Sequence, residues 1–350
     1  MNRNLLLPVV AIVVLIFAWM VLFGGLFTPD LHEVSIAVAG DVAMVNSIPD
    51  VLNGTESAFK GVSNVTSSVD MLVFNFENAV TYSDKAVRKE NPVRCEPRFA
   101  DLVRGNDNTV VALANNHVLD FGISGMRDTF DTLNKEHITY LGVGEDENQS
   151  RQNVTQEING RTVTIFNYMD SSNFENYSYD EMPHSDGLAP GYSQYDSSVA
   201  QKQISEAKES GDFVIVYMHF GKEYSDTPND DQKRIAHELI AYGADAVVGS
   251  HPHVAQGVEM YNGKPIFYSL GDFVSDLGME STLDTYFVKF DLAGDVCNCT
   301  LYPVHLNNCI PYFSEPNDGN ALLNSLDPKC PDLQISNGVG TLQFNLTKGD

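Results

Sequence analysis

The chain has 350 residues, with 47 Asp and Glu against 21 Lys and Arg, which gives a formal net charge of −26 at pH 7. This charge excludes a generic nucleic-acid-binding surface, because phosphate backbones bind to clustered Lys and Arg. A hydrophobic fraction of 43% is enough for a sizeable core and excludes a disordered acidic chain. We therefore expect one large domain, alone or with an appendage, and no nucleic-acid partner.

The N-terminal stretch Leu5–Phe27 contains 23 residues and no charged side chain. As a helix it would span roughly 35 Å, more than the ~30 Å hydrocarbon core of a bilayer. We predict a single transmembrane anchor over residues 1–28. Arg3 precedes the stretch and all the acidic residues follow it, so the positive-inside rule places the remainder outside the cytoplasm. A cleaved signal peptide is the alternative, but the run is long for one and no A-x-A-like site follows.

Two further features fit an extracytoplasmic location. Seven N-x-S/T sequons predict a glycoprotein, at Asn53, Asn64, Asn148, Asn153, Asn176, Asn298 and Asn345. Four of the five cysteines, Cys297, Cys299, Cys309 and Cys330, lie within the last 54 residues. Outside the cytoplasm they predict two disulfides that staple a C-terminal extension. A zinc site is the less favoured alternative, because the chain has no C-x-x-C pair.

After a short link at residues 28–30, apolar runs alternate with amphipathic segments. Apolar runs of this kind are typical of strands buried on both faces. In chain order we predict strands at Val34–Ala39, Met71–Phe76, Val110–Ala114, Val163–Tyr168, Phe213–His219, Ala246–Gly249, Pro265–Leu270 and Tyr286–Leu292. Helices are predicted at Met126–Lys135, Val199–Lys208 and Asp231–Tyr242. The alternation indicates an α/β protein.

We divide the chain into an anchor at 1–28, a main domain at 32–294 and a cysteine-containing extension at 295–350. The segment 148–198 is rich in Asn, Ser, Tyr and Asp, and is interpreted as surface loops around a single strand. Thr300–Leu306 and Thr341–Leu346 have the composition of short strands. The extension is therefore predicted to be a small β appendage.

Side chains able to bind metals follow five of the predicted strands, where the active-site loops of α/β folds gather. They are Asp41, Glu77, Asn115, Asn116, His117, His219, His251 and His253. Each one alone has an ordinary explanation as a turn, a cap or a hydrogen-bonded loop histidine. Their recurrence at successive strand ends favours a metal centre.

Six of these residues are the predicted metal ligands: Asp41, Glu77, Asn116, His219, His251 and His253. Asp41 and His253 would hold one ion, and Asn116, His219 and His251 a second, with Glu77 bridging. Mixed nitrogen and oxygen ligands suit one or two ions of Mn, Zn or Fe rather than Ca²⁺. Two divalent ions would leave the pocket net positive, so that it attracts an anion, and would acidify a bridging water into a nucleophile.

His117 stays outside this ligand set and is the candidate catalytic acid. Asp120, three residues later, would orient its imidazole, as carboxylates orient catalytic histidines. The alternative role for Asp120 is to cap the turn before Gly122.

At these residues the sequence resembles the CapA capsule-synthesis (poly-γ-glutamate) family of the calcineurin-like metallophosphatase superfamily. The resembling blocks are Ala-Gly-Asp at 39–41, Asn-Phe-Glu at 75–77, Ala-Asn-Asn-His-Val-Leu-Asp-Phe-Gly at 114–122, His-Phe-Gly-Lys-Glu-Tyr at 219–224, Gly-Ser-His-Pro-His-Val at 249–254 and Ile-Phe-Tyr-Ser-Leu-Gly-Asp-Phe at 266–273. The resemblance implies a four-layer α/β/β/α sandwich, an outward-facing membrane protein, the same six ligands and His117 as acid.

The sequence departs from the family pattern in two places. The superfamily usually has Asp-x-His in its first motif, whereas Ala43 stands at the histidine position here. Asp272 stands where the family commonly has Asn, and it would either join the site or cap a turn. Two further residues, Arg94 and Glu223, are candidate substrate contacts, with a surface ion pair and a loop hydrogen bond as their alternative roles.

Three functions remain open on the sequence. The first is membrane-anchored synthesis or export of a poly-γ-glutamate-like surface polymer, with a metal-dependent hydrolase-type site. The second is an extracellular metal-dependent phosphoesterase, by analogy at the level of the fold. The third is a non-catalytic, metal-stabilised scaffold of a membrane synthesis complex. The expected partners are an anionic polymer or phosphate ester, the membrane and other polymer-synthesis membrane proteins.

Overall fold

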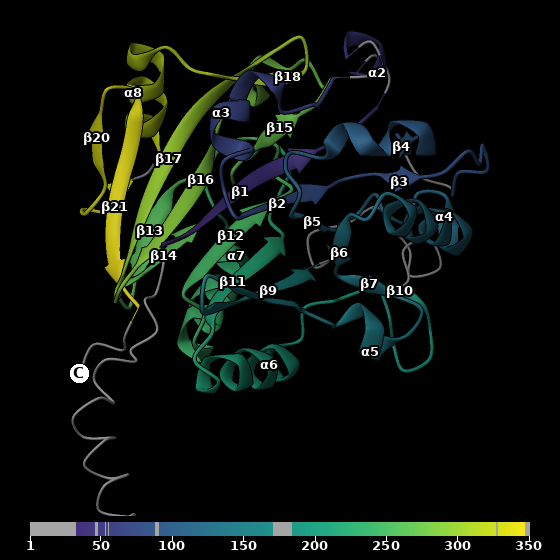
Figure 1. Cartoon of the computed structure of the whole chain (residues 1–350), viewed down its shortest axis with the longest axis horizontal. Helices are drawn as coiled ribbons and strands as arrows, with labels where there is room; N and C mark the ends of the chain where they lie inside the picture. Colours follow the sequence, from purple (N-terminus) through teal and green to yellow (C-terminus); the bar gives the residue numbers. More distant parts are fainter. Residues whose placement is uncertain are drawn as a thin grey trace, which may run out of the picture.

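The computed structural model describes residues 33–346, except 46–47, 53, 55, 88–90, 171–183 and 327. Two large sheets dominate the described chain (Figure 1). The first has ten strands: β1 (Val34–Val42), β2 (Met71–Phe76), β5 (Thr109–Ala112), β6 (Thr139–Leu141), β15 (Asp272–Val274), β16 (Asp284–Ala293), β17 (Val296–Asn307), β18 (Ile310–Phe313), β20 (Gln334–Ser336) and β21 (Val339–Asn345). Its main order is β20-β21-β17-β16-β1-β2-β5-β6.

The second sheet has the order β19-β13-β14-β12-β11-β9-β8. Its strands are β8 (Val154–Ile158), β9 (Arg161–Met169), β11 (Phe213–His219), β12 (Ala246–Ser250), β13 (Val258–Tyr261), β14 (Lys264–Phe267) and β19 (Pro328–Lys329). Two small pairs complete the strands: β3 (Ala79–Val80) with β4 (Arg94–Cys95), and β7 (Val143–Gly144) with β10 (Gly191–Tyr192).

The helices are α2 (Ile48–Val51), α3 (Ser63–Thr66), α4 (Gly122–Lys135), α5 (Glu147–Ser150), α6 (Ser197–Glu209), α7 (Asp230–Tyr242) and α8 (Pro316–Ser325). Three 3₁₀ turns are η2 (Lys60–Val62), η3 (Pro97–Val103) and η5 (Glu280–Thr282). The starts of α6 and α7 follow from the sequence, because Asp196 caps the first and Asn229 forms a capping box with Gln232 in the second.

The central core lies between the two sheets, and alternation along β1 shows how it forms. Val34, Ile36 and Val38 belong to the core shared with the second sheet, whereas Ala37 and Ala39 face the opposite layer. Successive strand residues point to opposite faces, so a strand covered on both sides reads as one continuous apolar run. The apolar run at the start of the domain therefore becomes a buried central strand.

Helices cover the outer faces of both sheets. α6 and α7 pack on the second sheet through a separate cluster that includes Ile204, Leu239 and Val216, and α6 lies below that sheet in Figure 1. On the first sheet, Met126 and Leu133 of α4 pack with Val111 of β5. The sheets are thus enclosed, and their parallel strands β1, β2, β5, β9, β11 and β12 direct their carboxyl ends into loops that carry polar residues.

Two parts of the expected fold need correction. The transmembrane helix expected over Leu5–Phe27 lies outside the described residues, and no helix within the described part of the chain is long and apolar enough to cross a membrane. The C-terminal residues are not a separate β appendage either: β17 pairs with β16 along its length and with β21, so they widen the first sheet.

The loop and disulfide expectations are also altered. The segment 148–198 contributes two neighbouring strands of the second sheet, β8 and β9, where one strand was expected. Cys95, Cys297, Cys299 and Cys330 are free cysteines, so the two predicted disulfides are absent from the described residues. Of the sequons, Asn64, Asn148, Asn153, Asn298 and Asn345 are exposed, whereas Asn53 and Asn176 lie outside the described residues. Glycosylation stays a prediction.

Candidate metal centre

Asp41 lies at an irregularity in β1, where the register with β2 shifts between Val38 and Asp41. The preceding residue, Gly40, has no room for a side chain, because a Cβ there would lie 1.9 Å from the carbonyl oxygen of Gly271. Oδ1 of Asp41 accepts a hydrogen bond from Asn75 at 2.7 Å. Burial raises the pKa of Asp41 to about 6, although His253 opposes this. Burial of this carboxyl group disfavours its charged form, and such perturbed acids are typical of functional sites.

Glu77 follows β2 and is 2% exposed. Its Oε1 lies 3.6 Å from Nε2 of His219, which is fully buried at the end of β11. The same Nε2 lies 2.9 Å from Oδ1 of Asn116. Residues from both sheets therefore meet at the Glu77 carboxylate.

His251 and His253 follow β12 with left-handed backbones, at φ of 97° and 63°. This conformation is strained for residues with a Cβ, and such strain is concentrated at functional sites. It brings the His251 ring to 4.7 Å from the His219 ring, between centroids. Burial alone would lower the pKa of His253, but Asp272, Glu77 and Asp41 together raise it well above its usual value.

The predicted ligands fall into two groups that share Glu77. One group is Glu77, His219 and His251, and the other is Asp41, Glu77 and His253. Within each group the ligand atoms lie within 4.8 Å of one another, and all the residues are buried. Imidazole nitrogens mixed with carboxylate oxygens fit Mn²⁺, Zn²⁺ or iron. The residues therefore fit one or two divalent ions, with Asn116 beside the first group.

His117 lies next to the ligands and is held by Asp120. Its Nδ1 is 2.7 Å from Oδ2 of Asp120, and its Nε2 is 3.9 Å from Oε1 of Glu77. Asp120 is fully buried and also accepts a hydrogen bond from the backbone N–H of Val93 at 2.6 Å. The carboxylate is therefore fixed where it can orient the imidazole, and the catalytic roles of the pair stay predictions.

The two predicted substrate contacts are not brought into the ligand cluster. The Arg94 guanidinium donates to the carbonyl of Ser83 at 3.1 Å and lies over the ring of Phe121. Glu223 is exposed, and the next residue, Tyr224, lies closer to the ligands, with its ring 5.7 Å from that of His253. Burial raises the pKa of Tyr224 to about 12, with Glu223 and Asp272 adding to the effect. Tyr224 is partly exposed and lies beside a predicted ligand.

Asn75 is a site residue that sequence reasoning missed, and Asn115, which it placed at a strand end, was given no role. Asn115 donates to Oδ1 of Asn75 at 2.9 Å, and Asn75 in turn donates to Asp41. Asn115 also accepts from the backbone N–H of His117 at 3.0 Å. Both residues stand in the sequence blocks that also contain predicted ligands, at 75–77 and 114–122. The hydrogen bonds from Asn115 to Asn75 and from Asn75 to Asp41 join segments that are distant in sequence, so the sequence alone does not predict them.

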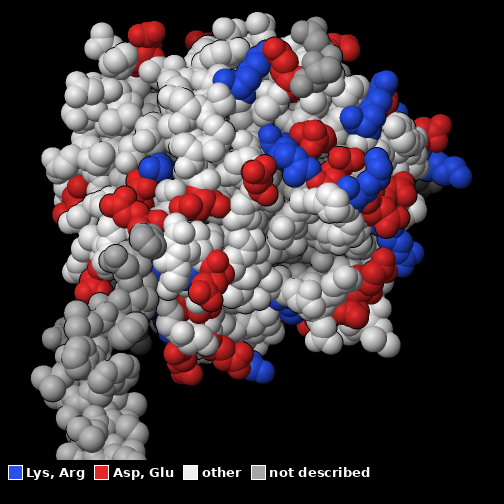
Figure 2. All heavy atoms as spheres, in the orientation of Figure 1, with Lys and Arg blue, Asp and Glu red and all other residues white. Residues whose placement is uncertain are grey.

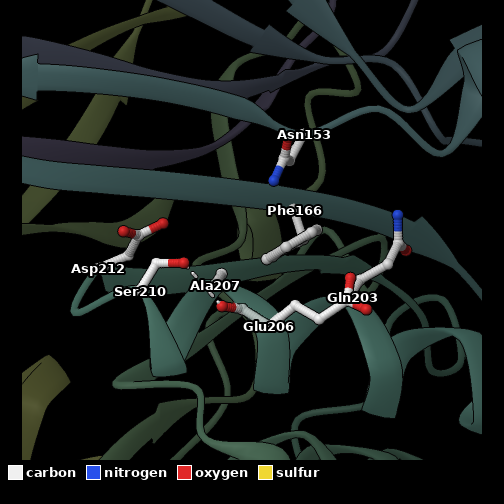
Figure 3. A pocket seen from close by; sticks show the side chains of 7 residues that line it. All are labelled: Asn153, Phe166, Gln203, Glu206, Ala207, Ser210 and Asp212. Atoms are coloured by element: carbon white, nitrogen blue, oxygen red, sulfur yellow. Dashed lines mark hydrogen bonds between the residues drawn. The ribbon is translucent and has the colours of Figure 1, made fainter.

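A hollow of about 290 Å³ lies elsewhere, between β9 and α6 (Figure 3). Its lining residues are Asn153, Phe166, Gln203, Glu206, Ala207, Ser210 and Asp212. They include two carboxylates and no Lys or Arg, so the hollow does not suit an anion.

On the face shown in Figure 2, acidic side chains are scattered widely, with basic ones mostly beside them.

Comparison with known proteins identifies the family of the chain. The family described as "Bacterial capsule synthesis protein PGA_cap" matches residues 35–277, which include all six predicted ligands. The PGA biosynthesis protein CapA of Bacillus subtilis (strain 168) is 32% identical over 301 residues, which cover 83% of this chain and 77% of that protein. The capsule biosynthesis protein CapA of Bacillus anthracis is 30% identical over 302 residues, which cover 82% and 72%.

A probable polyglutamine synthesis accessory protein of Mycobacterium tuberculosis is 31% identical over 218 residues, which cover 60% of this chain and 57% of that protein. Among solved structures, Chaetomium thermophilum Vps29 aligns with 89% of this chain and 95% of its own, at 9% identity. The TM-score of 0.32 is too low to indicate a shared fold. The family match and the two CapA relatives span most of the chain. This chain belongs to the bacterial capsule synthesis family PGA_cap.

Proposed function

We propose that this protein takes part in the synthesis or export of a poly-γ-glutamate-like surface polymer, and that it acts through a metal-dependent, hydrolase-type site. The observation that carries the proposal is the pair of buried ligand groups sharing Glu77, in a chain of the capsule synthesis family. Two relatives are named for PGA or capsule biosynthesis. Because capsules lie outside the cell, we propose that the domain acts on the outer side of the membrane, beside other polymer-synthesis proteins.

An anionic polymer suits this site despite the net charge of −26. Exposed charges are screened within about 8 to 10 Å, so the field at the substrate is set by the nearest groups. Divalent ions bound there would neutralise the buried carboxylates, polarise a substrate oxygen and acidify a water. Mn²⁺, Zn²⁺ and iron all suit the ligands.

The chain's own contribution to hydrolysis is proton transfer. Nδ1 of His117 faces Asp120, so Nε2 is the nitrogen on the side of the ring that faces Glu77, and a proton held there would point toward the ligands. A leaving amine or alkoxide bound there would take this proton as its bond to carbonyl or phosphorus breaks. Tyr224, partly exposed beside His253, would border the bound substrate.

The test replaces the gene in its own cells with the Glu77→Ala form and measures the amount and chain length of surface polymer. Because Glu77 belongs to both ligand groups, we expect a large loss of polymer or a changed chain length. The control is His305→Ala, since His305 pairs with Asp284 on the exposed surface. Polymer of unchanged amount and length in the Glu77→Ala strain would contradict the proposal.

A phosphoesterase is the second candidate, and the His117–Asp120 pair favours it. A positioned acid beside divalent-metal ligands can protonate the leaving oxygen of a phosphate ester as readily as an amine. The purified protein with Mn²⁺ should then hydrolyse an aryl phosphate, and His117→Ala should abolish most of the turnover. If no divalent ion supports turnover of any ester, this candidate fails while the polymer test still stands.

A further inference from the structure

Asp272 stands directly beside Asp41 in the fold. It begins β15, which runs parallel to β1 with Asp41 and Asp272 as register partners. The two chains approach closely at Gly40 and Gly271, and the backbone N–H of Asp41 donates to the carbonyl of Gly271 at 3.0 Å. Register partners on adjacent strands point to the same face of a sheet. The Asp272 carboxylate therefore lies on the face that carries Asp41.

The contacts of Asp272 place one oxygen against a predicted ligand. Oδ1 lies 2.9 Å from Nδ1 of His253, and the same nitrogen lies 3.5 Å from Oδ2 of Asp41. Among the described residues, Asp41 and Asp272 both form their ion pairs with His253. Nδ1 of His253 therefore faces both carboxylates.

The other oxygen of Asp272 has no such partner. Asp272 is 1% exposed, and its Oδ2 accepts no hydrogen bond from any described residue. A buried carboxylate oxygen without a donor destabilises the fold. A cation at this position would remove that destabilisation.

Two simpler roles for Asp272 do not account for both oxygens. A turn cap would accept from a backbone N–H, and within the described residues no backbone N–H donates to this carboxylate. Orienting His253 uses Oδ1 alone and leaves Oδ2 unsatisfied. Neither role explains why a second carboxylate is buried beside Asp41.

We propose that Asp272 is a further ligand of the ion held by Asp41, Glu77 and His253. This inference rests on the metal site of the proposed function and deepens it. The ion would have three carboxylates and one histidine as protein ligands, in contrast to the group of Glu77, His219 and His251. Carboxylate-rich sites suit harder ions, so this position should prefer Mn²⁺ over Zn²⁺ more strongly than the histidine-rich one.

The variant that separates the roles is Asp272→Asn. An asparagine keeps the shape and an oxygen that accepts from His253, but it removes the charge and the stronger metal-binding oxygen. The matched control is Asp284→Asn, because Asp284 also pairs with a histidine Nδ1, at 2.8 Å, on the exposed surface. Asp272→Ala serves as a second variant, with folding followed by circular dichroism.

The measurement is Mn²⁺ binding by calorimetry, together with the visible absorption spectrum of the Co²⁺-loaded protein. We expect Asp272→Asn to lower Mn²⁺ affinity at one site by about tenfold or more and to change the Co²⁺ bands, while Asp284→Asn changes neither. With metal removed by a chelator, Asp272→Asn should be at least as thermally stable as the wild type, because it removes a buried like charge beside Asp41.

The outcomes are distinguishable. Wild-type affinity with an unchanged Co²⁺ spectrum would overturn this inference alone, because the proposed metal site would still bind. Lower affinity with an unchanged spectrum would also overturn it and assign Asp272 to orienting His253. If the wild type binds no divalent ion, the proposed metal-dependent function fails and this ligand fails with it.

Discussion

Nδ1 of His117 lies 2.7 Å from Oδ2 of Asp120, and the opposite ring nitrogen points toward Glu77 at 3.9 Å. This pair joins a buried carboxylate to a partly accessible imidazole beside the ligand cluster. Asp120 is held in place by the backbone N–H of Val93, so the imidazole is oriented before any substrate binds. The relationship makes His117 the residue whose loss should affect catalysis without removing a ligand.

We expect His117→Ala to lower turnover of a hydrolysable ester or polymer by about 10² to 10⁴-fold, because positioned acids contribute on that order. Metal content should not change, since His117 is in neither ligand group. His305→Ala is the matched control, because it removes an exposed histidine that also pairs with an aspartate. Steady-state kinetics measure the turnover of each variant, and elemental analysis measures its metal content. Equal turnover in His117→Ala and His305→Ala would remove His117 from the mechanism.

Gly40→Ala should lower both stability and metal affinity. Its Cβ would meet the carbonyl oxygen of Gly271 at 1.9 Å, so β1 and β15 would have to move apart beside Asp41. Overpacking of this kind costs about 1–3 kcal/mol. Urea unfolding and Mn²⁺ calorimetry should show both losses together. A variant with wild-type stability would show that the two strands are not held at this distance.

Asp245 is a buried carboxylate outside the site, and its removal should cost more stability than that of an exposed acid. It pairs with Lys208 at 2.6 Å and Lys264 at 2.7 Å. We expect Asp245→Ala to lower the free energy of unfolding by about 3 kcal/mol, because two lysines lose their shared partner. Glu145→Ala, which breaks an exposed pair with Arg127, should cost less than about 1 kcal/mol. Similar losses for the two variants would contradict the buried pairing.

The cysteines should behave as buried thiols. Burial raises the pKa of Cys95 to about 12, and thiolates are the form that alkylating reagents attack. Sγ atoms of Cys297 and Cys299 lie 4.0 Å apart, well beyond the ~2.05 Å of a disulfide. We expect slow alkylation of these three in the native protein, and reaction of at least four thiols in guanidinium without reductant, by mass spectrometry. Reaction of a single thiol would instead support two disulfides.

Much of the two-sheet core could be predicted because its strands are buried on both faces. Met71–Phe76 and Phe213–His219 are the observed strands β2 and β11, residue for residue. The six predicted ligands all lie at strand ends, and Asp41, Glu77, His219, His251 and His253 form the two ligand groups. Local patterns are sufficient here, because parallel strands bring their carboxyl ends together.

The remaining features depend on pairings between distant segments, which a local pattern does not contain. The strands after residue 294 looked like an appendage, but β17 pairs with β16 over residues 284–305 and becomes part of the first sheet. Arg94 was a candidate substrate contact with a surface ion pair as its alternative role, but its guanidinium donates to the backbone carbonyls of Thr81 and Ser83. The position of Asp272 beside Asp41 follows from the register of β15 on β1, more than 200 residues apart in sequence.

The most direct test of the account is the number of divalent ions per chain, measured by elemental analysis after dialysis against Mn²⁺. Because Glu77 is shared by both ligand groups, we predict up to two ions in the wild type, fewer in His253→Ala and none in Glu77→Ala. The control His305→Ala should match the wild type. A Glu77→Ala variant that is folded and holds as much metal as the wild type would contradict a centre built around Glu77.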